Sequence, residues 1–182
     1  MTQDYSLGPD LTDGQPFPVL RRAIDVAPQG YALEFGVAEG TSLAIIADKM
    51  PTVGFDSFLG IPESWGPYPK GARACIPPDI PNTRLVVGLY ADTLPGFDFS
   101  DVDPIALVHF DCDLYNSVVT VLDWITPWLD DGCCMVFDEW HGQPWHADHE
   151  EKAWREYAND TRINWEVIGH DREAWAIRIV GQ

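Results

Sequence analysis

Short apolar runs alternate with segments of helical periodicity along most of this chain. Runs of strand length occur at 31–35, 52–55 and 83–87, and two more end at Asp111 and Asp138. Segments with helical spacing lie beside or between them, at 19–27, 43–49, 117–129 and 150–157. This order predicts strands joined by right-handed crossovers, which is typical of a parallel sheet.

The last two apolar runs follow a different pattern. Residues 165–168 and 174–180 flank a short turn at 170–173, so they predict a hairpin. We therefore expect residues 1–182 to form a single α/β domain. Its sheet should have seven strands, mostly parallel, with an antiparallel last strand.

Two segments lack periodicity. Residues 1–18 carry Gly, Pro and Asp, and predict an N-terminal arm that packs on the domain or reaches a neighbouring subunit. Residues 60–82 are rich in Pro, Gly and aromatic residues. A loop of this length in a compact domain is usually functional, so we expect a lid or a substrate loop.

Acidic residues follow two of the predicted strands directly. Asp111 and Asp113 come after one strand, and Asp138 and Glu139 after the next. The carboxyl ends of parallel strands meet at one edge of a sheet, where α/β proteins bind ligands. Crowded carboxylates are costly unless a cation, a proton or hydrogen bonds neutralise them. The four acids are therefore a candidate metal and catalytic cluster.

A glycine-containing turn follows the first predicted strand. Gly36 allows a sharp turn, and Gly40 would let the next helix approach a ligand with its free N–H groups. The spacing departs from the G-x-G-x-x-G of dinucleotide binders. Glu34 and Glu39 are poor neighbours for a phosphate, so a ligand with a cationic group fits better.

Composition narrows the range of partners. Eleven Lys and Arg against 29 Asp and Glu give a net charge of −18, which argues against nucleic acid and anionic membranes. A neutral substrate such as a sugar or a phenol fits better. No apolar stretch has the length of a membrane span, so we expect a soluble, cytoplasmic protein. The four cysteines form no C-x-x-C pattern and are expected to be free thiols.

These motifs resemble one protein family. The segment from Glu34 to Gly40 resembles the first motif of class I S-adenosylmethionine (SAM) methyltransferases, and residues 54–63 resemble a hallmark of one branch. That branch contains the macrocin and mycinamicin sugar O-methyltransferases. Residues 92–95, 111–115 and 138–139 match further motifs of the branch in the same order. The resemblance covers about residues 30–180 and implies the Rossmann-like class I methyltransferase fold.

The resemblance implies a binding site for SAM. Gly36 and Gly40 would pass beneath its methionine part, with Glu34 below the amino group. Asp56 would accept hydrogen bonds from the ribose hydroxyls, for which a carboxylate has enough acceptor sites. The other residues implied to contact the cofactor are Val37, Thr41, Ser42, Ser57, Phe58, Gly88 and Asp111.

The resemblance also implies a metal and a base. Asp111, Asp138 and Glu139 would hold Mg²⁺, which prefers oxygen ligands. The family usually has Asp-Asp where this chain has Asp138-Glu139. Asp113 resembles the proposed general base, and His141 is a second candidate because histidine transfers protons near neutral pH.

The expected activity is metal-dependent methyl transfer to a hydroxyl of a sugar, glycoside or oligosaccharide, by a homodimer. Four aromatic residues could stack on a sugar ring or merely cover the edge of the core: Trp65, Tyr68, Trp140 and Trp145. A catechol-type phenol is an alternative acceptor. A metal-dependent glycosyltransferase that uses Asp111-x-Asp113 as a D-x-D motif is an alternative enzyme.

Overall fold

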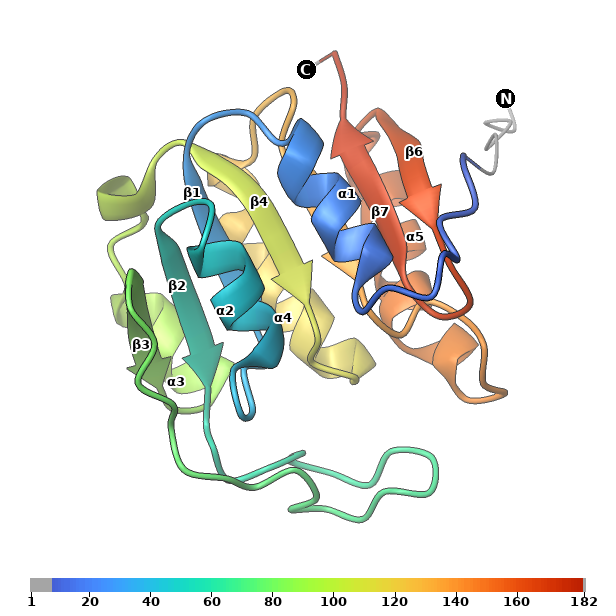
Figure 1. Ribbon diagram of the computed structural model, residues 1–182. Helices are drawn as coiled ribbons and strands as arrows, with labels where there is room; N and C mark the ends of the chain where they lie inside the picture. Colours follow the sequence, from blue (N-terminus) through green and yellow to red (C-terminus); the bar gives the residue numbers. More distant parts are fainter. Residues whose placement is uncertain (1–7, 182) are drawn as a thin grey trace.

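The computed structural model describes residues 8–181, which fold around one sheet (Figure 1). In this part of the chain the sheet has seven strands in the order β3-β2-β1-β4-β5-β7-β6. The strands are β1 (Tyr31–Phe35), β2 (Thr52–Asp56), β3 (Thr83–Val87), β4 (Ile105–Phe110), β5 (Cys134–Phe137), β6 (Trp165–His170) and β7 (Trp175–Ile179). The first five strands pair in parallel, and β7 is antiparallel to both β5 and β6. The predicted α/β fold and its antiparallel last strand are confirmed.

Helices cover both faces of the sheet (Figure 1). On one face, α1 (Pro18–Val26) packs on β4, β5, β6 and β7, and α2 (Thr41–Ala47) packs on β1 and β2. The other face carries α3 (Tyr90–Thr93), α4 (Tyr115–Ile125) and α5 (Glu150–Thr161). The short 3₁₀ helices are η1 (Leu94–Gly96), η2 (Phe99–Val102), η3 (Thr126–Trp128) and η4 (His146–Asp148).

The helix predicted at 117–129 ends earlier than expected. Helix α4 stops at Ile125 and continues as the 3₁₀ turn η3, which contains Pro127. Proline has no N–H to donate and its ring crowds the carbonyl one turn back, so the α-helix cannot run through it. The short helices α3, η1 and η2 lie between β3 and β4, where the sequence pattern predicts no regular element.

The two-residue period of the strands divides the core into two parts. Leu33 and Phe35 of β1 face the cluster under α4 and α5, whereas Ala32 faces the cluster under α1. Strands β4 and β5 are buried along their whole length. Burial on both faces explains why these strands are continuous apolar runs in the sequence rather than alternating ones.

A row of phenylalanine rings crosses the sheet at its carboxyl edge. Phe55, Phe35, Phe110 and Phe137 occupy paired positions on β2, β1, β4 and β5. Neighbouring ring centroids lie 4.8, 5.9 and 4.8 Å apart, and all three ring pairs are stacked. Each ring comes immediately before a residue of the expected site, so the row fixes the four strand ends relative to one another.

The arm packs on its own domain in the residues that the structure describes. The His170 N–H donates to the Pro9 carbonyl (3.0 Å), and the Leu11 N–H donates to the His170 carbonyl (2.7 Å). The arm thereby covers the outer edge of β6. Residues 1–7 of the predicted arm lie outside the described part of the chain.

The predicted lid lies across the carboxyl edge of the sheet, between β2 and β3 (Figure 1). Its two limbs are tied by hydrogen bonds between Ile61 and both Ala72 and Gly71. In residues 8–181, no helix combines the length and apolar composition needed to cross a bilayer. The four cysteines are free thiols, as expected.

Candidate active site

A cavity of about 500 Å³ opens at the carboxyl edge of the sheet. Its walls come from the glycine turn after β1, the end of β2, the lid, the loop between β3 and α3, and the loops after β4 and β5. The edge that the acidic motifs indicated is therefore the edge that holds the cavity.

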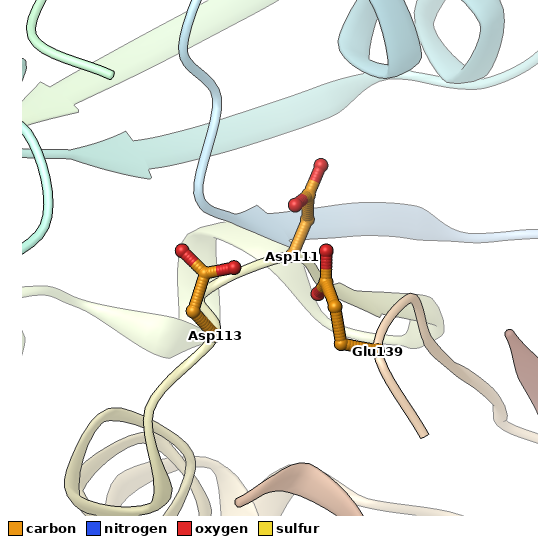
Figure 2. A group of neighbouring side chains, drawn as sticks. All are labelled: Asp111, Asp113 and Glu139. Atoms are coloured by element: carbon orange, nitrogen blue, oxygen red, sulfur yellow. The ribbon is translucent and has the colours of Figure 1, made fainter. Parts of the chain in front are cut away.

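Three carboxylates gather in one small space beside this cavity. Figure 2 shows Asp111 and Asp113, from the loop after β4, facing Glu139, from the loop after β5. One carboxylate oxygen from each of the three lies within 4.8 Å of the others. We call these residues the acidic triad.

The protons of the triad are held more tightly than usual. Burial raises the pKa of Asp111 and of Glu139 well above their ordinary values, and neighbouring carboxylates add to this effect. Burial also raises the pKa of Asp113 to about 7, although the Arg73 guanidinium opposes the rise. Without a cation, at least part of the triad is therefore protonated at neutral pH.

The donor set suits a hard divalent cation. All the ligand atoms are carboxylate oxygens, and the buried Oε2 of Glu139 has no hydrogen-bond partner. An unpaired buried oxygen is costly, and a cation would satisfy it while compensating the clustered negative charge. Asp111, Asp113 and Glu139 are the residues that could hold such an ion.

Asp138 was predicted to hold the metal together with Asp111 and Glu139, but it lies outside their cluster. It lines the cavity, but it does not belong to the acidic triad, whose third member is Asp113. Asp138 Oδ1 instead lies 3.9 Å from Nε2 of the buried His109. This buried neighbour of Asp138 was not predictable from the spacing of residues along the chain.

Glu34 does not reach the cavity. Its side chain is completely buried, and its Oε1 lies 2.8 Å from Nδ1 of His109, which is also completely buried. Burial alone would lower the pKa of His109, but the nearby carboxylates of Asp138 and Glu34 outweigh burial and raise that pKa. Glu34, which was predicted to lie near the cofactor, pairs with His109 instead of lining the cavity.

Asp56 holds the glycine turn in place. Its Oδ2 accepts hydrogen bonds from the N–H groups of Val37 (2.8 Å) and Ala38 (2.9 Å), and its Oδ1 accepts one from Phe58 (2.8 Å). The carboxylate also lines the cavity. Three of its roughly four acceptor sites are used by the backbone, so it has room for about one further donor such as a ribose hydroxyl.

Close packing around Gly36 and Gly40 explains why both positions need glycine. A side chain at Gly36 would come within 1.7 Å of the Asp111 carbonyl oxygen, so this residue lets the turn pack against the loop after β4. A side chain at Gly40 would meet Ile80 at 2.5 Å and Pro78 at 2.9 Å. Both residues also have positive φ, which glycine adopts freely. The absence of a side chain at Gly40 makes room for Pro78 and Ile80 of the lid, and Gly40 is not among the lining residues.

The other residues predicted to contact the cofactor divide into two groups. The cavity is lined by Val37, Thr41, Ser42, Ser57 and Asp111, as well as by Gly36 and Asp56. Phe58 and Gly88 do not line it. Phe58 is buried against Val37 and Leu43, and Gly88 donates its N–H to the Asp56 carbonyl (3.0 Å).

His141 is not placed to act as a base in this cavity. Its Nε2 lies 3.2 Å from the indole N–H of Trp175 and 3.0 Å from the Asp171 carbonyl. These partners belong to the β6–β7 hairpin, and His141 is not among the lining residues. The ring packs on that hairpin because the chain turns away from the cavity after Glu139.

The aromatic residues pack mainly on one another. Trp65 is buried and stacks on both Tyr68 and His146, with ring centroids 5.4 Å apart in each pair, so little of its ring is free to stack on a sugar. Trp140 is buried and stacked on Trp175 at 5.3 Å. The first stack connects the lid to the loop after β5.

Several residues that line the cavity were not predicted from the sequence. Leu89 and Tyr90 follow β3, and their position after a strand end could have identified them. Phe17 comes from the arm and has a positive φ of 55°, which the sequence does not signal. Arg73 of the lid also lines the cavity, opposite a wall rich in carboxylates.

Comparison with known proteins adds a family and a set of structural neighbours. A family model described as a methyltransferase domain matches residues 33–140. No curated protein matches the sequence at a significant level.

Solved structures with a similar fold include three named methyltransferases. CalS11, a calicheamicin methyltransferase, is 25% identical with a TM-score of 0.68, over 88% of this chain and 75% of that chain. Its apo structure is described as a TDP-rhamnose 3'-O-methyltransferase. The O-methyltransferase NovP is 19% identical with a TM-score of 0.66, over 89% of this chain and 78% of that chain. MycE, from the mycinamycin pathway and bound to Mg and SAH, is 15% identical with a TM-score of 0.56, over 88% and 47%. The last two support the fold alone.

Proposed function

The chain belongs to the methyltransferase-domain family and is a SAM-dependent O-methyltransferase, and on this premise we propose that it methylates a hydroxyl of a sugar, glycoside or oligosaccharide with the help of a divalent cation. The observation that carries the proposal is the acidic triad, placed in the same cavity as the glycine turn. One part of the cavity suits a cofactor and the other suits a cation and an acceptor.

The glycine turn and its neighbours form the cofactor side. SAM supplies a methyl group on a positively charged sulfonium. The turn is already held in shape by Asp56, which also lines the cavity. The cavity wall also carries Glu39 and Asp56 near the turn, so the local charge favours a cationic ligand.

The triad forms the acceptor side. Asp111, Asp113 and Glu139 would hold a divalent cation, which supplies positive charge that lowers the pKa of a nearby hydroxyl. A carboxylate has two oxygens, so Asp113 keeps one free to take the proton of the acceptor hydroxyl. The backbone of Asp113 has a positive φ of 62°, so the chain turns sharply at this residue, directly after Cys112.

The sugar class is supported by the structural neighbour CalS11, whose description names a rhamnose acceptor. A catechol-type phenol is the alternative acceptor, because two adjacent hydroxyls present the same pair of oxygens in either compound. The glycosyltransferase alternative is wrong, because the family match and the fold belong to methyltransferases.

Binding of the product cofactor is the first test. We expect purified protein to bind S-adenosylhomocysteine in isothermal titration, at micromolar concentration, both with and without Mg²⁺. Labelled methyl transfer to a panel of glycosides, oligosaccharides and catechols would then identify the acceptor. Absence of S-adenosylhomocysteine binding in both conditions would contradict the proposal, and transfer to catechols alone would replace the sugar class.

A further inference from the structure

Glu150 is a completely buried acid outside the cavity lining. It is the first residue of α5, and its side chain is 0% exposed. Its neighbours include the charges of Asp111, Asp113 and Asp138, which add to the effect of burial in raising its pKa. A glutamate is rarely buried without a specific partner, so its contacts need an explanation.

One oxygen of Glu150 holds the backbone of the acidic triad. The Glu139 N–H donates to Glu150 Oε2 at 3.1 Å, whereas Oε1 has no hydrogen-bond partner. Strand pairing of β5 stops at Phe137, and the Asp138 N–H still donates to the Phe110 carbonyl at 3.0 Å. The Glu139 N–H has no strand partner and is held by Glu150, and the next backbone contact is the His141 N–H to the Glu173 carbonyl at 3.1 Å.

A simple helix-capping role does not account for this contact. The carboxylate lies near the positive end of the α5 dipole, which is favourable, but its hydrogen bond goes to a different loop. The next residue, Glu151, also lies in the first turn and instead pairs with Arg155 at 2.7 Å. Glu151 therefore lies in the same first turn as Glu150 and has the same side chain, without its link to the triad.

We propose that Glu150 is a positioning residue that fixes Glu139 in the cation site through the Glu139 amide. The inference rests on the proposed function, because it concerns the same triad. Glu139 has a longer side chain than aspartate, with more rotatable bonds and therefore more freedom to leave the site. Anchoring its backbone restores part of the precision that the longer side chain loses.

The test compares two substitutions at one position. Glu150→Gln keeps an oxygen that can accept from the Glu139 N–H, and Glu150→Met keeps a similar shape without any acceptor. The readouts are Mn²⁺ affinity by electron paramagnetic resonance and S-adenosylhomocysteine affinity by titration. Glu151→Met, in the same helical turn, is the matched control.

We expect Glu150→Met to weaken Mn²⁺ binding by about 10- to 100-fold, the usual effect of losing a residue that orients a metal ligand. Glu150→Gln and Glu151→Met should stay within about threefold of the parent, and all three should bind S-adenosylhomocysteine like the parent. If Glu150→Met does not fold, Glu150→Asp replaces it in the Mn²⁺ measurement. Aspartate is shorter by one methylene, so its oxygens lie farther from the Glu139 N–H and Mn²⁺ binding should also weaken.

Three results would overturn the inference. Unchanged Mn²⁺ affinity in Glu150→Met, or in Glu150→Asp where that variant is used, would show that the anchor is not needed. An equal loss in Glu150→Gln would show that the charge matters rather than the hydrogen bond. A parent protein that binds S-adenosylhomocysteine but no Mn²⁺ would remove the cation site and this inference together. A parent that binds neither would instead reject the proposed function.

Discussion

Asp113 is the residue on which the proposed chemistry depends most. Its carboxyl faces the other two members of the triad, and burial raises its pKa to about 7. We expect Asp113→Asn to lower methyl transfer by roughly 100- to 10,000-fold, the usual contribution of a general base. S-adenosylhomocysteine affinity should stay unchanged in isothermal titration. Normal turnover in this variant would remove Asp113 from the mechanism.

The Glu34–His109 pair is the second residue-level feature with a clear consequence. Both side chains are completely buried, and they lie 2.8 Å apart. Glu34→Ala should lower the free energy of unfolding by roughly 3–5 kcal/mol, because it leaves His109 buried without its partner. Urea unfolding measures this loss. Glu166→Ala breaks the exposed pair with Arg178 and is the control, with an expected loss of at most about 1 kcal/mol. Equal losses in the two variants would contradict the buried-pair interpretation.

The strand ends were predictable from the sequence, but the partners of the residues beyond them were not. An apolar run that stops at Asp111 or Asp138 places these acids at the carboxyl edge of the sheet whatever the details of packing. Asp113 belongs to the triad, whereas Asp138 lies 3.9 Å from the buried His109 of the neighbouring strand β4. Such a contact between side chains on different strands leaves no periodic trace in the sequence.

The contacts of whole segments were also not predictable from the sequence. The lid was expected at 60–82 from composition alone, yet its contact with Gly40 through Pro78 and Ile80 follows from the three-dimensional path of the loop. The arm was expected to pack on the domain or on a neighbour, and residues 9–11 pair with the edge strand β6. Local sequence predicted that these segments are irregular, and tertiary packing decided what they touch.

The row of phenylalanine rings is the element-level support of the site. Phe110 stacks on Phe137 at 4.8 Å and on Phe35 at 5.9 Å, in the middle of the row. Phe110→Ala should cost roughly 3–5 kcal/mol of stability, as expected for a large cavity in a core, and should be measurable by urea unfolding. Phe110→Leu, which keeps most of the volume, is the control and should cost clearly less. A loss below about 1 kcal/mol for alanine would show that the row does not support the strand ends.

The whole molecule carries a net charge of −18, and its stability should depend on pH in an unusual direction. Burial raises the pKa of Asp111, Glu139 and Glu150, so the folded protein keeps protons that the unfolded chain loses above about pH 4. The folded state therefore binds more protons, and its stability falls as pH rises. We expect the cation-free protein to melt at a lower temperature at pH 8 than at pH 5.5. Mg²⁺ should reduce the difference, because it replaces the protons. A melting temperature that rises with pH in chelator would contradict the burial of these acids.

The central claim is that the acidic triad holds a cation needed for methyl transfer. The most direct measurement is the rate of transfer from labelled SAM to the best acceptor of the glycoside panel, in EDTA and after Mg²⁺ is restored. We predict that EDTA abolishes transfer and that Mg²⁺ restores it in the parent protein. Asp111→Asn should stay inactive in both conditions. A parent rate that is unchanged in EDTA would contradict the claim.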